Sequence, residues 1–86
     1  MNQSDVHTIL NSSISAYQRG DLAESRLLLA NLMKHDVRAV VGDSLYDTAM
    51  EIYVFVFSGD LTKEGRRGGF TSIEECRKSL DTVVNL

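Results

Sequence analysis

The lack of proline and the spacing of the glycines constrain the fold of this 86-residue chain more than any other feature. Proline breaks helices, because it lacks an amide donor and clashes with the preceding turn, so a chain without proline can form long helices. Glycine is a poor helix former and marks turns. The six glycines leave segments of helical length between them and lie at Gly20, Gly42, Gly59, Gly65, Gly68 and Gly69. This pattern predicts an all-α fold.

Residues 4–19 and 21–35 are predicted to form the first two helices. In the first segment apolar residues recur every three or four positions, which places them on one face of a helix. The second segment has a broad apolar face that comprises Leu22, Leu27, Leu28, Leu29, Leu32 and Met33. Ser4 suits the N-cap of the first helix. Lys34 and His35 fall in the last turn of the second helix, where positive charge interacts favourably with the helix dipole.

The junction between these two helices predicts a helical hairpin. Gly20 suits the left-handed position that follows a helix, and Asp21 can cap the next helix. Glu24 lies three residues after Asp21 and completes a capping box. The two helices are therefore expected to fold back on each other at this point.

The segment 52–57 is rich in β-branched and aromatic residues, which would also suit a buried strand. However, the helical spacing of apolar residues begins earlier, at Leu45, and no other segment alternates in a way that would give a strand a partner. We therefore predict a third helix over 44–58.

Gly42 leaves the start of this third helix open, because glycine costs about 1 kcal/mol relative to alanine inside a helix. Residues 37–41 either begin the same helix, with Asp36 as the cap, or form a separate turn, with Asp43 or Ser44 capping a shorter helix.

The last part of the chain is predicted to form a loop and a fourth helix. Residues 59–71 are rich in glycine and are expected to form a mobile surface loop. A helix is predicted over 72–84, because Ser72 and Glu75 make a second capping box and an apolar stripe follows. The chain as a whole, residues 1–86, is predicted to be a single domain, a small antiparallel bundle of four helices.

A repeated Gly-Asp-Leu triplet adds a family resemblance. It occurs at 20–22 and 59–61, which are 39 positions apart, in the range of helical-hairpin repeats. After the first triplet, Ser25 and Leu29 form a small and large pair on the second helix. The first hairpin thereby resembles a tetratricopeptide (TPR-like) unit, although the Trp and Pro of that pattern are absent. A plain antiparallel bundle is the alternative, since Gly-Asp also serves at ordinary helix junctions.

The chain shows no catalytic or metal-binding pattern. His7 and His35 lack a second ligand-type residue at the spacing of a helical metal site, apart from the neighbouring Asp36. No serine lies in a glycine-flanked turn between a strand and a helix. We therefore expect a protein that is not an enzyme and that holds no cofactor or metal.

Charge and cysteine content bear on partners and compartment. The net charge is −3 and is spread along the chain, so no basic stripe marks a nucleic-acid site. The lone Cys76 cannot form an intrachain disulfide and suits a reducing environment. The sequence shows no signal-peptide pattern and no apolar stretch long enough to span a membrane. These features predict a cytoplasmic protein.

One apolar row on the third predicted helix is the main candidate for function. Tyr46, Met50, Tyr53 and Phe57 follow one another at helical spacing beside a second apolar row. Such a row is either core or, in a bundle this small, a surface without an intramolecular partner. Exposed aromatic and methionine side chains are typical of protein interfaces. Because small cores are often stabilised by oligomerisation, we expect a homodimer formed through this helix.

These features lead to two functional hypotheses. The first is an adaptor, chaperone or regulator that binds another protein, with Arg66 and Arg67 as candidate contacts for an anion or an acidic partner. The second is a small dimeric DNA-associated transcriptional regulator in which these two arginines, together with Arg77 and Lys78, contact phosphates. The acidic net charge disfavours nucleic acid as the partner.

Overall fold

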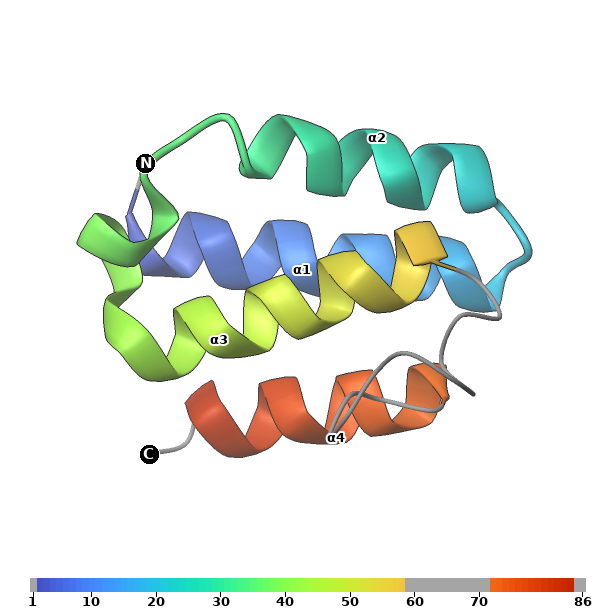
Figure 1. The fold of residues 1–86 in the computed structure, drawn as a ribbon. Helices are drawn as coiled ribbons and strands as arrows, with labels where there is room; N and C mark the ends of the chain where they lie inside the picture. Colours follow the sequence, from blue (N-terminus) through green and yellow to red (C-terminus); the bar gives the residue numbers. More distant parts are fainter. Residues whose placement is uncertain (1, 59–71, 85–86) are drawn as a thin grey trace.

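Four helices make up the part of the chain that the structure, a computed structural model, describes, residues 2–58 and 72–84. The helices are α1 (Gln3–Gln18), α2 (Leu22–Leu32), α3 (Val37–Ser58) and α4 (Ile73–Val84). They run alternately in opposite directions, so the all-α antiparallel bundle predicted from the sequence is confirmed (Figure 1). The loop predicted over 59–71 lies outside the described residues.

Two of the helices, α1 and α3, lie in the middle of the bundle, and α2 and α4 flank them on opposite sides (Figure 1). Within the described residues α2 and α4 do not contact each other. One hydrophobic core joins all four helices and includes Leu10 and Ile14 of α1, Leu29 of α2, Ile52 of α3 and Leu80 of α4. Because α3 lies between α2 and α4, one side of it remains at the surface.

The first helix begins earlier than the sequence predicted. Asn2, and not Ser4, is the N-cap: its Oδ1 accepts a hydrogen bond from the Asp5 amide at 2.9 Å. The Asp5 Oδ2 in turn accepts from the Asn2 amide at 3.1 Å. This reciprocal capping box satisfies two free amides at the helix start, so the helix extends past Ser4 to Gln3.

The predicted hairpin between α1 and α2 is present. Gly20 has a φ of 85°, the left-handed conformation expected after a helix. Asp21 accepts a hydrogen bond from the Glu24 amide at 3.1 Å and so caps α2. The small side chains of Ser13 and Ser25 are fully buried, which allows α1 and α2 to approach closely.

The pair that carried the TPR-like resemblance, Ser25 and Leu29, is buried in this hairpin. The second Gly-Asp junction, at Gly59, lies outside the described residues. The structure therefore shows one helical hairpin with small residues in its interior.

The second helix is shorter than predicted, since it ends at Leu32 and not at residue 35. The amides of Lys34 and His35 donate to carbonyls three residues back, at 3.3 and 3.1 Å, and form a turn. The chain must leave the helix here because Asp36 caps the next one, with its Oδ1 accepting from the Ala39 amide at 3.4 Å. Lys34 and His35 therefore belong to the connection and not to the last turn of α2.

Both alternatives for residues 37–41 contain part of the observed structure. These residues are helical and are capped by Asp36, as in the longer version. Gly42, however, has φ 81° and ψ −179°, which interrupts the helix with a kink. The helix predicted over 44–58 is thus the longer arm of α3, and a short helical turn precedes it.

The fourth helix agrees with its prediction. It runs from Ile73, one residue after the predicted start, and Ser72 Oγ accepts from the Glu75 amide at 3.2 Å. Its buried side chains include Cys76 and Leu80.

Candidate functional site

The predicted row on α3 lies at the border between core and surface. Tyr46, Met50 and Tyr53 are half-buried, and Phe57 is 38 % exposed. The second apolar row of this helix, which includes Ile52, is fully buried. The predicted row is therefore partly core and partly surface. Its inner edge packs against the core, and its outer edge reaches solvent.

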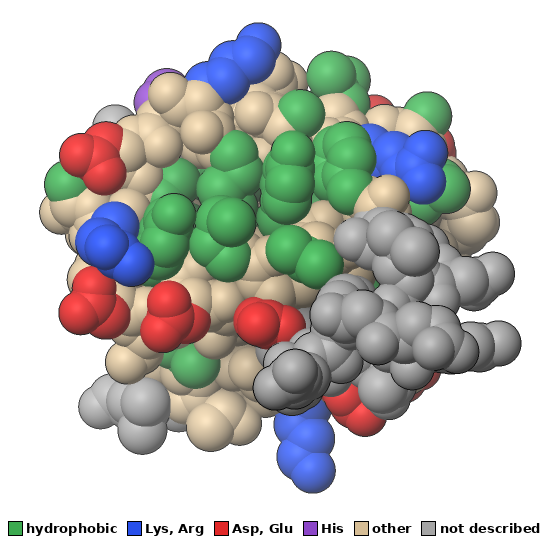
Figure 2. All heavy atoms as spheres, viewed as in Figure 1, with side chains coloured by type: hydrophobic (Ala, Val, Ile, Leu, Met, Phe, Trp, Pro, Cys, Tyr) green, Lys and Arg blue, Asp and Glu red, His purple; other side chains and the backbone are tan. Residues whose placement is uncertain are grey.

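This row faces the neighbouring helix α2. Figure 2 shows hydrophobic side chains gathered along the line where α2 and α3 meet. We call Met33 together with Tyr46, Met50, Tyr53 and Phe57 the α2–α3 surface. Met33 is the C-cap of α2 and is half-buried. The sequence placed it on the apolar face of its helix but gave no sign that it would join this site.

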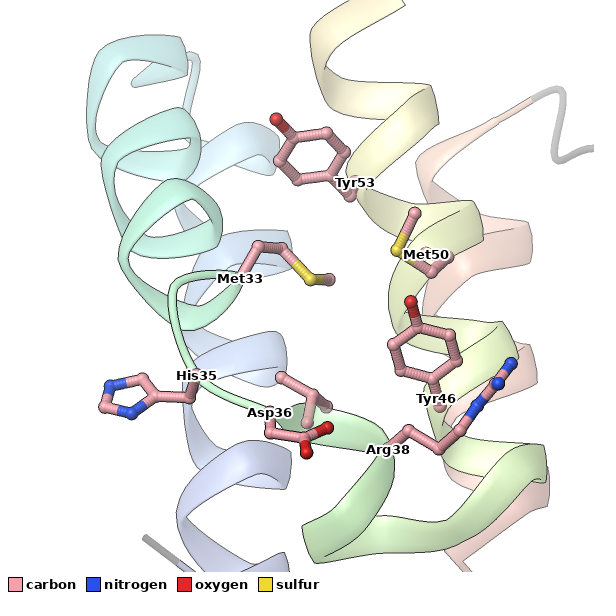
Figure 3. A pocket seen from close by; sticks show the side chains of 8 residues that line it. Met33, His35, Asp36, Arg38, Tyr46, Met50 and Tyr53 are labelled. Atoms are coloured by element: carbon pink, nitrogen blue, oxygen red, sulfur yellow. The ribbon is translucent and has the colours of Figure 1, made fainter.

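A hollow of about 440 Å³ lies within the α2–α3 surface. Met33 and Met50 point into it from opposite sides, and Tyr46 and Tyr53 flank Met50 along α3 (Figure 3). His35 borders the hollow through its backbone, but its ring points away (Figure 3). Asp36, Val37 and Arg38 complete the lining, so two flexible thioethers and two aromatic rings lie beside an acidic and a basic side chain. Thioethers and aromatic rings suit apolar contacts of adaptable shape.

Contacts between neighbouring side chains hold these aromatic rings in place. The rings of Tyr53 and Phe57 stack with their centroids 4.5 Å apart and their planes 26° from parallel. The guanidinium of Arg26 on α2 lies 5.8 Å from the Phe57 centroid, and that of Arg38 lies 4.6 Å from the Tyr46 centroid. Cation–π contacts and ring stacking of this kind orient the rings before any partner binds.

Apolar side chains are also exposed on α2. Leu22 and Leu27 are 37 % and 57 % exposed and are, with Phe57, the large hydrophobic side chains most open to solvent among the described residues. The sequence assigned both leucines to the apolar face of the second helix. The structure buries that face only in part.

Acidic side chains border the α2–α3 surface on its α3 side (Figure 2). Asp43, Asp47 and Glu51 follow one another at intervals of four residues, which places them in one row along the helix. Asp43 and Asp47 are exposed and Glu51 is half-buried. Arg38 forms an ion pair with Asp43 at 3.3 Å, with side chains 61 % and 82 % exposed. The sequence suggested a capping role for Asp43 alone, although helical spacing places all three acidic residues beside the hydrophobic row of the same helix.

Of the four basic residues singled out from the sequence, the structure describes Arg77 and Lys78, which line one hollow together with the acidic Glu74 and Asp81. Arg66 and Arg67 lie outside the described residues. The guanidinium of Arg77 donates to Asn11 at 2.6 Å, to Ser15 at 3.0 Å and to Gln18 at 3.2 Å. Arg77 therefore links α4 to α1 and has few donors left for a phosphate, whereas Lys78 is exposed.

The described residues contain no group of three or more His, Cys, Asp or Glu side chains that could hold a metal ion. Cys76 is fully buried in the core, where its thiol is shielded from reagents. None of the helices described has the length and apolar character that crossing a membrane requires.

Comparison with protein-family models, with curated proteins and with solved structures finds no match to this chain. Function must therefore be argued from the α2–α3 surface itself.

Proposed function

We propose that this chain is a non-enzymatic interaction module, an adaptor, chaperone or regulator, that binds a protein partner through the α2–α3 surface. The observation that carries the proposal is that aromatic and methionine side chains from two helices converge around one open hollow. Met33 and Met50 face each other across it, and Tyr46 and Tyr53 border it.

The composition of the α2–α3 surface supports this proposal. Tyrosine, phenylalanine, methionine and arginine are enriched at protein interfaces, and energetically dominant contacts are commonly aromatic. Here Tyr53 and Phe57 are stacked on each other, and the guanidinium of Arg26 also lies close to the Phe57 ring. Side chains that are already ordered lose little conformational entropy on binding, which favours affinity.

Two further expectations from the sequence extend the proposal. The first is that the protein works in the cytoplasm, for which its reduced and buried Cys76 is suited. The second is a homodimer through α3, in which a second copy would cover the same surface and so take the place of a separate partner. Light scattering tests it: a monomer mass for the wild type, unchanged in Tyr53→Glu, would contradict it. The DNA-associated regulator draws less support, because Arg77 is engaged with α1.

Site-specific photo-crosslinking tests the proposal in the cells from which the protein comes. A photoreactive amino acid replaces Met50, on the α2–α3 surface, or Thr8, which is exposed on α1. We expect discrete protein adducts from position 50 that are missing from position 8. Equal adducts at both positions, or none at position 50, would contradict the proposal.

A further inference from the structure

The shape of the α2–α3 surface suits a helical occupant. Tyr46, Met50, Tyr53 and Phe57 follow one another in steps of four, three and four residues along α3. The antiparallel α2 lies beside this row and contributes Met33. Two neighbouring helices with an apolar seam between them form a trough into which a third helix can place its own apolar stripe.

The charge along this trough is uneven. On the α3 side the acidic row of Asp43, Asp47 and Glu51 runs beside the hydrophobic row. Asp36, which directly precedes α3, is also exposed. Arg38 offsets one of these charges through its ion pair with Asp43. Asp47 forms no ion pair with any described residue. A partner that lies in the trough therefore meets negative charge along one flank.

A second copy that packs antiparallel through α3 fits this acidic flank poorly. If two copies packed antiparallel through α3 about a two-fold axis, their acidic rows would lie on the same side of the interface. The Asp47 side chains of the two copies would then approach each other near the axis, and like charges at an interface repel. A partner with basic side chains on that flank meets complementary charge instead.

From these observations we infer that the α2–α3 surface binds an amphipathic helix of another protein, with an apolar stripe for the trough and Lys or Arg along the flank that faces Asp43, Asp47 and Glu51. This inference rests on the proposed function and adds the chemical character of the partner. Attraction between the flanks sets orientation and selectivity, while the apolar stripe supplies most of the contact.

Three designed helical peptides test the inference, each about 16 residues long so that it spans the longer arm of α3. They share one leucine stripe and carry Lys, Gln or Glu on the same flank. Fluorescence anisotropy with the full chain measures their affinities at low and high salt. We expect the Lys peptide to bind ~10-fold more tightly than the Glu peptide at low salt, with the Gln peptide between them, and the difference to shrink at high salt.

A charge-reversed variant and a matched control locate the effect. Asp47→Lys is expected to reduce the preference for the Lys peptide to about threefold or less, because it removes one negative charge from the row and adds a positive one. Glu74→Lys makes the same change of charge at an exposed position on α4 and is expected to keep the full preference. Circular dichroism checks that both variants stay helical. A preference that survives in Asp47→Lys would overturn the inference.

The other outcomes separate this inference from the proposed function. If all three peptides bind equally and Tyr53→Glu abolishes binding, the charge inference is wrong and the interaction surface stands. If no peptide binds, an amphipathic helix is not the occupant, and photo-crosslinking at position 50 decides on the proposed function independently. If light scattering shows a dimer that Tyr53→Glu dissociates, a second copy occupies the surface and the inference is overturned.

Discussion

Ser25 on α2 is fully buried, and its hydroxyl has no hydrogen-bond partner among the described residues. A buried hydroxyl without a partner has lost its hydration without compensation. Replacing Ser25 by alanine removes this penalty, so we expect the free energy of unfolding in urea to stay unchanged or to rise by up to about 1 kcal/mol.

Ser13 provides the matched control, because it is equally buried but donates a hydrogen bond to the Leu10 carbonyl at 2.8 Å. Ser13→Ala loses that bond and is expected to be about 0.5–1 kcal/mol less stable than Ser25→Ala. Both changes are Ser to Ala inside a helix, so differences in helix propensity cancel. A larger loss of stability in Ser25→Ala than in Ser13→Ala would show that the Ser25 hydroxyl has a partner in solution.

At the residue scale the sequence indicated the apolar row on α3 but not the residues around it. Met33 joins the site only because α2 ends beside α3, and a helix end is set by competition between caps. Leu27, Leu28 and Leu29 illustrate a second limit. Three consecutive residues on a helix point in three directions, and only Leu29 reaches the core.

The kink in α3 is the element-scale feature on which the placement of the site depends. Gly42, with φ 81° and ψ −179°, lies in a region that is essentially restricted to glycine. A Cβ at this position would meet nothing within 4 Å, so the cost of a substitution comes from the backbone alone. We expect Gly42→Ala to lower the free energy of unfolding by about 2 kcal/mol.

Gly20→Ala is the comparison for this prediction. Gly20 also has open space around it, but its φ of 85° lies at an ordinary helix C-terminus, where alanine costs about 1 kcal/mol. Urea unfolding followed by circular dichroism measures both variants. A Gly42→Ala protein as stable as the wild type would show that the helix runs straight through residue 42 in solution.

Local signals in the sequence were sufficient to predict that the four helices exist. Asp21 and Ser72 accept the predicted hydrogen bonds from the Glu24 and Glu75 amides, because side-chain caps act on amides only two or three residues away. The Asp21 amide donates to the Ala16 carbonyl, so the predicted capping box with Glu24 is not completed. The conformation of Gly42 could not be predicted in the same way. Its backbone angles depend on how the two arms of α3 pack on the other helices, which is tertiary information.

At the scale of the whole molecule, the arrangement of the helices creates the site. Since α1 and α3 occupy the centre and α2 and α4 do not touch within the described residues, α3 keeps one surface strip next to α2 (Figure 1). Hydrophobic periodicity indicates which helix faces are apolar, but not which neighbours cover them. Helical spacing along α3 already places the acidic row beside the hydrophobic row, whereas the fact that α2 borders the hydrophobic row follows only from this arrangement.

The central claim is that the α2–α3 surface binds a protein helix, and methyl NMR tests it most directly. The ¹³C-labelled methyl groups of Met33 and Met50 report on the hollow, and that of Ile73, buried on α4, serves as the control. On titration with the Lys-flanked peptide, we predict that the Met33 and Met50 signals shift together and saturate with one dissociation constant while Ile73 stays in place. Methionine signals that do not move, or an Ile73 signal that moves as far as they do, would contradict the claim.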